Sequence, residues 1–301
     1  MSENTDRAAR AALIRLADSE GAEPVLIMAG SEQVPLVFDS PHSGRFYPDD
    51  FRSVISRRTL QEYEDRFVDL LIADGADHGV TTLAANFPRA YIDPNRAPDD
   101  IDEDMLDAVW PDPLTPTRHS QQGTGLIFRH MPDETPIYGA KLTVEEVNRR
   151  LDSCWRPYHA ALDGAIAGAR ARHGAVWHVN WHSMRPVGEA MTPDPGEQRA
   201  DFVLGDRQGT SCEPEFTAFI ADSLQAMGYS VAVNHPYQGA YIVERHGHPR
   251  EGRHSIQIEI NRGLYMDLDT LEKIARFDAV RQDIGRLAGK LAEWSAARAS
   301  G

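Results

Sequence analysis

The sequence predicts an α/β protein in which helices pack on both faces of a central sheet. Three observations predict this class: short apolar runs bounded by polar turns, longer stretches with helical spacing, and the alternation of the two along the chain. A chain of 301 residues, 41% of them hydrophobic, can bury one substantial core. No internal repeat or linker divides the chain, so we expect a single domain over residues 1–301.

The predicted elements follow one another in a regular order. Strands are predicted at Pro35–Ser40, Val80–Phe87, Ala175–Val179, Phe202–Leu204, Ser230–Asn234 and Ile256–Ile260. Helices are predicted at Arg57–Ala73, Thr143–Ala171, Glu213–Met227 and Thr270–Ala297. The second of these helices begins with the spacing of a capping box, because Thr143 and Glu146 are three residues apart. In sheets with such alternation, ligands usually bind beyond the carboxyl ends of the strands.

Two segments lack any periodicity. Residues 97–140 are rich in Pro, Asp, Gly and Thr, and Met184–Gln198 is a second polar segment of the same kind. A long structureless loop in a compact domain is usually either functional or disordered. We therefore expect residues 97–140 to form a lid or rim over the functional site.

Composition and charge exclude several classes of protein. The formal net charge of −15 argues against a nucleic-acid partner, which requires a basic face. If the ligand is a small anion, local cations must overcome this acidic surface. Cys154 and Cys212 form no CxxC pair and indicate no disulfide framework. With no signal-peptide pattern and no apolar run of membrane-spanning length, we expect a cytoplasmic protein without a membrane partner. The oligomeric state is not predicted.

Two histidines lie at the ends of predicted strands. His42 belongs to the SPHSG turn after the first strand, and His182 belongs to the WHSM segment after the third. One such histidine is explained equally well by a hydrogen bond within its own turn. Two of them at the carboxyl ends of one sheet can meet at the same edge, which is how a mononuclear zinc site is assembled.

A catalytic zinc site needs a third protein ligand and an open position for water. The predicted helix Arg57–Ala73 has an apolar face, and Glu62, Asp65 and Asp69 share another face. Without a metal, these carboxylates are simply solvated. With a metal, Asp65 is the candidate ligand and Glu64 is its main competitor.

The run Ile256–Arg262 alternates apolar and polar side chains. Gln257, Glu259 and Asn261 therefore lie on one face of the strand and the isoleucines on the other. On an edge strand this pattern means only that one face is solvated. On a central strand the polar face needs partners, because buried carboxylates are costly unless paired. Glu259 is then the candidate general base beside a metal.

Arginines beside polar turns are the candidates for binding an anion. Arg89 and Arg96 bracket an Asp-Pro-Asn turn directly after the second strand. A guanidinium binds a carboxylate through two parallel hydrogen bonds, although surface ion pairing explains the pattern equally well. Arg262 and Arg207 are further candidates, and the polar turn after Leu204 is suited to an anion held by backbone N–H groups.

Taken in order, these segments resemble the N-formylglutamate amidohydrolase family. The likeness runs from Pro35 to Asp267, most of the chain. The motifs are SPHSG (Ser40–Gly44), EDRFVD (Glu64–Asp69), RAYIDPNR (Arg89–Arg96), PYHAAL (Pro157–Leu162), WHSM (Trp181–Met184), LGDRQGTSC (Leu204–Cys212) and IQIEINRGLYMD (Ile256–Asp267). Each motif alone is weakly specific, whereas the ordered set is specific.

The resemblance implies a fold and a metal site. Members of the family resemble zinc carboxypeptidases, so the expected sheet is mixed and mostly parallel, of the phosphorylase/hydrolase-like type. The implied cofactor is Zn²⁺, with manganese or iron as other divalent candidates. The implied ligands are His42, Asp65 and His182, with Glu259 as general base.

The resemblance also implies a substrate. Asn95 and Arg96 are expected to hold the substrate carboxylate, with help from Arg89 or Arg262. The implied reaction is hydrolysis of N-formyl-L-glutamate to formate and L-glutamate, a late step of histidine breakdown. The chain departs from the family pattern at Pro94, where an aliphatic residue is common.

A second departure is at Asn180, where many members have an acid two positions before the histidine. It removes a charge from the surroundings of the implied metal. Such residues around the ligands tune metal affinity and ligand basicity. Neither departure removes an implied ligand. Both bear on whether this chain acts on the same substrate as other members of the family.

Three alternatives remain open at this stage. A hydrolase acting on a different N-acyl amino acid or amide keeps the same metal site. A protein that binds an anionic amino acid without turnover is disfavoured, because it gains nothing from Glu259 as a base. A serine or cysteine nucleophile is disfavoured, since the chain has no GxSxG elbow and Cys154 lies within a predicted helix.

Overall fold

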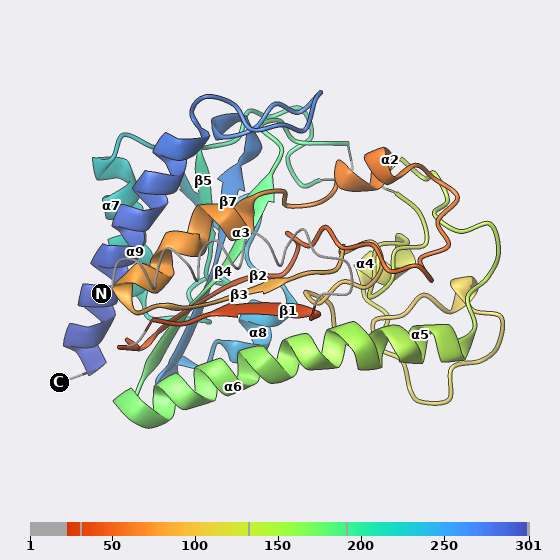
Figure 1. Cartoon of the computed structure of the whole chain (residues 1–301), viewed down its shortest axis with the longest axis horizontal. Helices are drawn as coiled ribbons and strands as arrows, with labels where there is room; N and C mark the ends of the chain where they lie inside the picture. The colour runs from red at the N-terminus through yellow and green to blue at the C-terminus, as the bar shows by residue number, and fades with distance from the viewer. Residues whose placement is uncertain (1–22, 31, 132, 191, 300–301) are drawn as a thin grey trace.

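The chain forms a central sheet flanked by helices (Figure 1), in a computed structural model that describes residues 23–30, 32–131, 133–190 and 192–299. The strands of this part are β1 (Val25–Met28), β2 (Leu36–Ser40), β3 (Thr81–Ala85), β4 (Val176–Met184), β5 (Phe202–Gly205), β6 (Val231–Val233) and β7 (Arg253–Asn261). They form one seven-stranded sheet in the order β1-β3-β2-β4-β7-β5-β6. The adjacent strands β3, β2, β4 and β7 are parallel, whereas β1 and β5 run antiparallel to β3 and β7. The predicted mixed, mostly parallel sheet is confirmed.

Helices cover both faces of this sheet, as predicted. The α-helices of the described residues are α2 (Arg57–Gln61), α3 (Val68–Ile72), α4 (Arg118–Gln121), α5 (Val144–Arg150), α6 (Arg156–His173), α7 (Pro214–Ala226), α8 (Tyr241–His246) and α9 (Phe277–Ala299). Shorter turns are η1 (Ala73–His78), η2 (Glu103–Met105), η4 (Pro249–Glu251), η5 (Arg262–Leu264) and the π-helical η3 (Leu151–Trp155). In Figure 1, α6 lies along one side of the strands, and α3, α7 and α9 lie on the other. None of the helices described here has both the length and the apolar character to cross a membrane.

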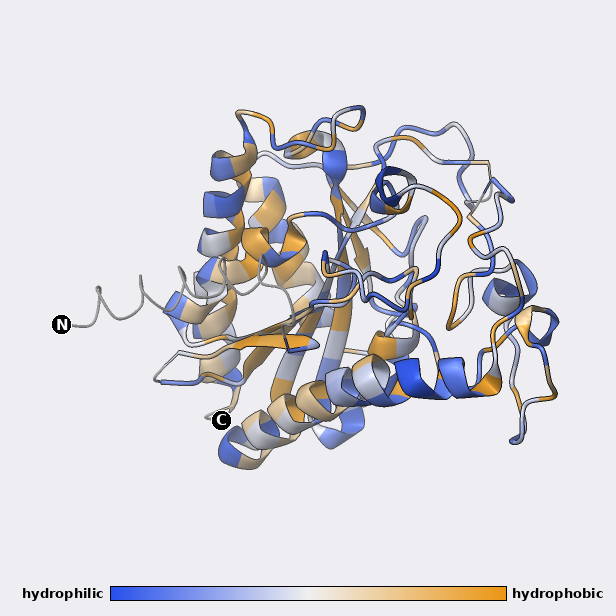
Figure 2. Cartoon of the chain, turned by 45° about the vertical axis from the view of Figure 1, so that its right-hand side comes forward, coloured by the Kyte–Doolittle hydropathy of each residue, from blue (hydrophilic) through white to orange (hydrophobic). Residues whose placement is uncertain are grey.

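The sheet separates two apolar layers. Phe38, Trp181 and Ile258 are fully buried in the layer that contains α3, α7 and α9. Val37 and Tyr158 are fully buried in the layer beneath α6. Figure 2 shows hydrophobic residues concentrated in the strands and in the helix turns beside them. Each fully buried large side chain contributes roughly 1.5–3 kcal/mol, so these layers hold the strand ends in fixed positions.

The prediction of one continuous helix over Arg57–Ala73 is wrong. An irregular segment separates α2 from α3, and in it Phe67 adopts the left-handed conformation with φ of 67°. Asp65 also lies in this segment, where its N–H donates to the carbonyl oxygen of His42 at 2.9 Å. Tertiary contacts of this kind override helix propensity. The expected common helix face of the three acidic residues therefore does not form.

Other differences concern short elements and helix ends. The edge strand β1 and the short helix α8 are absent from the sequence prediction. The helix predicted from Thr270 begins only at Phe277, and the helix predicted over Thr143–Ala171 is interrupted by the π-helical turn η3. The capping box of Thr143 and Glu146 is present at the beginning of α5. The third predicted strand, Ala175–Val179, is also longer than expected, since β4 runs to Met184 and contains His182.

The parallel strands bring the candidate residues to one edge of the sheet. His42 follows β2, and Arg89 follows β3. His182 and Glu259 lie near the carboxyl ends of β4 and β7. Because parallel strands end at the same edge, the four side chains gather where ligands of open α/β sheets usually bind.

Candidate active site

A cavity of about 520 Å³ opens at this edge of the sheet. Eight residues singled out from the sequence line it, namely His42, Asp65, Arg89, Asn95, Arg96, His182, Glu259 and Arg262. Both irregular segments contribute to its wall, since residues 97–140 supply Arg118 and His119 and the segment after β4 supplies Glu189. The cavity is therefore built from loops fixed on a rigid sheet.

Arg207 does not lie in this cavity. Its guanidinium pairs with Glu244 at 3.2 Å, and Arg207 is not part of the cavity wall. The polar turn around it is satisfied internally, because the Gly209 N–H donates to the carboxylate of Asp206 at 2.8 Å. The structure therefore separates Arg207 from the other candidate residues.

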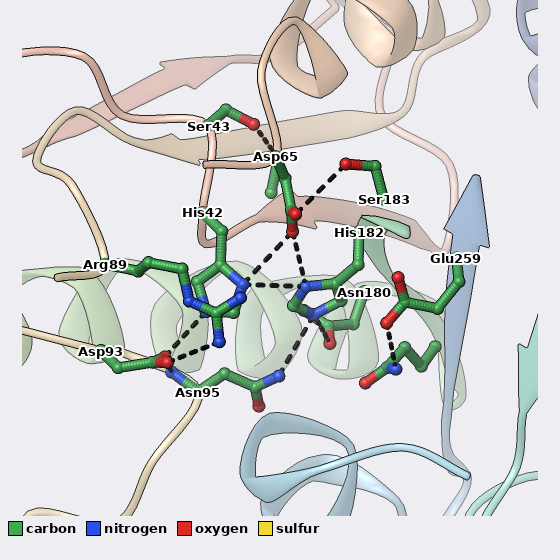
Figure 3. A network of polar contacts seen from close by, with 12 residues as sticks. His42, Ser43, Asp65, Arg89, Asp93, Asn95, Asn180, His182, Ser183 and Glu259 are labelled. Atoms are coloured by element: carbon green, nitrogen blue, oxygen red, sulfur yellow. Dashed lines mark hydrogen bonds and ion pairs between the residues drawn. The ribbon is translucent and has the colours of Figure 1, made fainter. Parts of the chain in front are cut away.

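Two imidazoles and a carboxylate of the cavity wall converge (Figure 3). The Nδ1 atoms of His42 and His182 are 3.0 Å apart. Oδ2 of Asp65 lies 3.0 Å from the His182 Nδ1 and 3.3 Å from the His42 Nδ1. All three residues are at most 3% exposed. One ligand atom from each lies within 4.8 Å of the others, which is a spacing suited to a metal ion.

The hydrogen-bond partners of the two Nε2 atoms determine the protonation of the Nδ1 atoms of His42 and His182. Nε2 of His42 lies 2.7 Å from Oδ1 of Asp93, and Nε2 of His182 lies 2.7 Å from Oδ1 of Asn180. Each oxygen accepts a hydrogen bond, so each Nε2 carries the proton and each Nδ1 presents a lone pair. Burial also lowers the pKa of His182 and keeps its ring neutral. Two nitrogen lone pairs and a carboxylate oxygen then face one another, a donor set that fits zinc or another divalent cation.

Asp65 is held by contacts on its second oxygen. Oδ1 accepts from Arg262 Nη2 at 3.0 Å and from Ser183 Oγ at 3.2 Å. Burial raises the pKa of Asp65, but the polar groups that converge on it, with His182 and His42 foremost, outweigh this effect and hold the pKa well below its usual range. The side chain is therefore a carboxylate aimed at the two imidazoles.

Glu64, the competing acidic candidate, lies elsewhere. Its carboxylate accepts from the Tyr47 hydroxyl and pairs with Arg66 at 3.1 Å. Glu64 does not line the cavity. The structure thus brings Asp65, and not Glu64, to His42 and His182.

The turn after β2 places His42 by docking on the segment that contains Asp65. Besides the backbone bond from Asp65 to the His42 carbonyl oxygen, the Asp69 N–H donates to Ser43 Oγ at 3.2 Å. Gly44 allows the turn to pass close to the chain after β3. A Cβ atom added at Gly44 would lie 2.1 Å from the Phe87 carbonyl oxygen. The glycine is required by this close approach of two backbones.

Gly44→Ala is therefore expected to lower the free energy of unfolding by about 1–3 kcal/mol, because the backbone must move to relieve the overlap. Urea unfolding followed by circular dichroism measures the change. Gly164→Ala is the matched control, since Gly164 is an exposed position within α6 where an added Cβ meets nothing within 4 Å. It is expected to stabilise the protein by about 0.5–1 kcal/mol. Equal effects of the two changes would contradict the role of Gly44.

Glu259 lies beside His182 on the neighbouring strand. The two residues are register partners in the parallel pair β4–β7, so their side chains project from the same face (Figure 3). Gln257 Nε2 donates to Glu259 Oε1 at 2.9 Å, and the strand is central in the sheet. Burial, together with the negative charge of Asp65, raises the pKa of Glu259 to about 8. A carboxyl group with a pKa near neutrality suits proton transfer.

The turn after β3 supplies further polar groups. Arg89 Nη2 donates to Asp93 Oδ2 at 2.8 Å, so this arginine holds the carboxylate that orients His42. Asn95 Nδ2 lies 3.2 Å from His182 Nε2, and its Oδ1 accepts from the Ile242 N–H at 2.9 Å. Arg96 donates to the backbone oxygens of Thr124 and Asn95 and lies 3.3 Å from His119 Nδ1.

Sequence reasoning gave no role to several residues that the structure places at the site, and Asp93 and Arg118 are two of them. Asp93 contacts His42 directly, and a signal was available because Asp93 belongs to the polar turn directly after a strand. Arg118 lines the cavity from α4, within residues 97–140. No sequence pattern distinguishes Arg118 from other exposed arginines, because only the path of the loop brings it to the cavity.

Several known proteins are similar to this chain. A family model described as N-formylglutamate amidohydrolase matches residues 34–266. The chain is similar to the crystal structure of N-formylglutamate amidohydrolase from Ralstonia eutropha JMP134, with a TM-score of 0.86 and 45% identity over 90% of this chain and 98% of that one. It is 30% identical over 240 residues to N-formylglutamate deformylase of Pseudomonas aeruginosa, covering 78% of this chain and 83% of the relative. A gene product of Agrobacterium tumefaciens, Atu2144, shares the fold, with a TM-score of 0.64 at 17% identity over 93% of this chain and 95% of that one.

The fold and the cavity define an α/β enzyme with a candidate active site at the carboxyl edge of its sheet. The family match covers well over half of the chain, and the solved structure matches almost end to end. The chain belongs to the N-formylglutamate amidohydrolase family.

Proposed function

We propose that the chain is a zinc-dependent amidohydrolase that cleaves N-formyl-L-glutamate to formate and L-glutamate. The observation that carries the metal part of the proposal is the convergence of His42, Asp65 and His182, with both imidazoles oriented through their outer nitrogens. The substrate part is supported by the family and by the named activity of its relatives. Manganese or iron fits the same donor set.

We assign the chemical roles as follows. A divalent cation held by the three ligands supplies polarisation of the acyl carbonyl and lowers the pKa of water. Glu259 takes the proton of the attacking water and delivers it to the leaving amine, for which its raised pKa is suited. Arg262 holds Asp65 in place, and Arg89 holds Asp93. Both guanidiniums also provide positive potential where negative charge develops on the acyl oxygen.

The charges of the cavity favour a substrate with two negative groups. Six arginines line it, namely Arg89, Arg96, Arg118, Arg185, Arg199 and Arg262. Four of them pair with carboxylates. Arg89 pairs with Asp93, Arg185 with Glu62 and Glu189, Arg199 with Asp194, and Arg262 with Asp65. Among the residues that the structure describes, Arg96 and Arg118 form no ion pair with a carboxylate. We assign Arg96, with Asn95, to the α-carboxylate of the substrate and Arg118 to its side-chain carboxylate.

This assignment predicts a substrate-dependent effect at Arg118. Arg118→Gln is expected to lower kcat/KM for N-formyl-L-glutamate about tenfold, the loss of ~1.4 kcal/mol of charge-assisted binding at an exposed position. The value for N-formyl-L-glutamine should change little, because that substrate has no second charge. Arg286→Gln, at an exposed arginine of α9 outside the cavity, is the control. Equal losses with the two substrates would contradict the assignment.

The function itself is tested by a formate-release assay on purified protein supplied with zinc. We expect kcat/KM to be highest for N-formyl-L-glutamate, lower for N-formyl-L-aspartate and lowest for N-acetyl-L-glutamate, whose hydrolysis is followed by release of the amine. Comparable turnover of the acetyl compound would favour the general N-acyl amino acid hydrolase. Tight binding of these compounds without any turnover would favour the non-catalytic binding protein.

A further inference from the structure

A series of buried hydrogen bonds leads from His182 into the interior of the protein. His182 Nε2 lies 2.7 Å from Asn180 Oδ1, and Asn180 Nδ2 donates to Asp39 Oδ1 at 2.8 Å. The three residues come from the adjacent strands β2 and β4, where Asp39 and Asn180 are register partners. Their exposed fractions are 3%, 0% and 0%, so water does not compete for these contacts. Figure 3 shows the Asn180 amide beside the His182 ring.

The shortest contacts of this series of hydrogen bonds favour one arrangement of donors and acceptors. An ionised carboxylate only accepts hydrogen bonds, so the NH₂ group of the Asn180 amide faces Asp39. The carbonyl oxygen of the amide must then face His182, and it requires a proton on Nε2. Asn95 Nδ2 also lies near this nitrogen, but at the longer distance of 3.2 Å. The shorter contact fixes the tautomer, and it leaves the Nδ1 lone pair directed at His42 and Asp65.

Asp39 itself is anchored by three donors. His178 Nε2 lies 2.8 Å from Oδ1, which also receives the Asn180 amide, and the Tyr158 hydroxyl donates to Oδ2 at 2.5 Å. His178 is fixed in turn by Ser255 Oγ, 2.8 Å from its Nδ1. Burial raises the pKa of Asp39, but the hydrogen bonds from His178, Tyr158 and Asn180 outweigh this effect, so the pKa lies below its usual value. Contacts from α6, β4 and β7 thus hold a single buried charge.

The two imidazoles therefore differ in their support. His42 faces the carboxylate of Asp93 directly, at 2.7 Å. His182 faces an amide, and the carboxylate stands one residue further away. We propose that Asp39 acts through Asn180 as a positioning residue that holds His182 in the Nε2–H form with its Nδ1 facing the centre of the site. The expected effect on zinc binding rests on the proposed function. The orientation of the His182 ring is a property of the metal-free protein and can be measured separately.

Moving the carboxylate from position 39 to position 180 tests the proposal. The variants are Asp39→Asn, Asn180→Asp and the double variant that exchanges the two side chains. Zinc affinity is measured by competition with a chromogenic chelator, and the tautomer of His182 by ¹⁵N NMR of the metal-free protein. Asp39→Asn is expected to weaken zinc binding about 10–100-fold, the effect typical of a partner of a ligating histidine. The double variant should recover most of this loss, because its carboxylate meets Nε2 directly.

Asn180→Asp alone is expected to weaken zinc binding, because it places a second carboxylate against Asp39 in a buried position. Asp206→Asn is the matched control, since Asp206 is a buried carboxylate that bonds an asparagine, Asn234, outside the cavity. It should leave zinc affinity unchanged. Tyr158→Phe, which removes one anchor of Asp39, provides a milder variant if Asp39→Asn does not fold.

Two results would overturn the inference. One is wild-type zinc affinity and an unchanged His182 tautomer in folded Asp39→Asn. The other is a double variant that folds but binds zinc no better than Asp39→Asn. If the wild-type protein bound no metal, the proposed function would fail, while the NMR measurement would still decide whether Asp39 sets the tautomer.

Discussion

Replacing Glu259 with glutamine is expected to lower kcat for N-formyl-L-glutamate by a factor on the order of 10²–10⁴, the usual contribution of general acid–base catalysis. The amide keeps the size of the carboxylate and can still contact Gln257, so the local structure should survive. It cannot take a proton from water at neutral pH. Because Glu259 is not one of the three converging ligands, the zinc content should stay at the wild-type level.

Zinc content and kcat must be measured on the same preparation for this prediction to be informative. Glu64→Gln is the matched control, since Glu64 is a carboxylate at 1% exposure that lies outside the cavity. It should retain both metal and turnover. If Glu259→Gln kept kcat within a few-fold of the wild type, the general base would have to be another group.

The local pattern of the chain predicts the positions of the catalytic candidates well. Strand-end histidines and the alternation of Gln257 and Glu259 can be seen in the sequence because they depend on strand periodicity and on nothing distant. The structure adds what the alternation alone does not supply, namely that β7 is a central strand and that Glu259 lies in register with His182 of β4. The edge-strand alternative is thereby removed.

Contacts set by tertiary structure could not be predicted in the same way. The segment around Asp65 carries a helical pattern, yet Phe67 adopts a left-handed conformation so that Asp65 can reach the histidines. The link from Asp39 to Asn180 depends on β2 and β4 being neighbours in one register, although 141 positions separate the two residues. Arg207 shows the opposite case, because it lies in a polar turn after a strand but outside the cavity, and the Gly209 N–H of that turn already bonds to Asp206.

His182→Ala is expected to abolish both zinc retention and turnover. Removal of one of three protein ligands leaves His42 and Asp65, which is fewer than a catalytic zinc site needs. The loss of zinc affinity should exceed the roughly 10–100-fold that follows from changing an outer partner of a ligand. Zinc content by elemental analysis and formate release, measured before and after dialysis against a chelator, check the prediction. Added zinc should restore the dialysed wild-type protein but not the variant.

A control must separate loss of a ligand from loss of a buried imidazole. His254→Ala serves this purpose, because His254 is 8% exposed and lies at the amino end of β7, stacked on Trp177 with ring centroids 5.2 Å apart. It removes a comparable side chain at the opposite edge of the sheet from the cavity. We expect this variant to lose stability but to keep its zinc. A folded His182→Ala protein with full zinc content and turnover would contradict the metal site, whereas zinc loss in both variants would mean that retention reports stability alone.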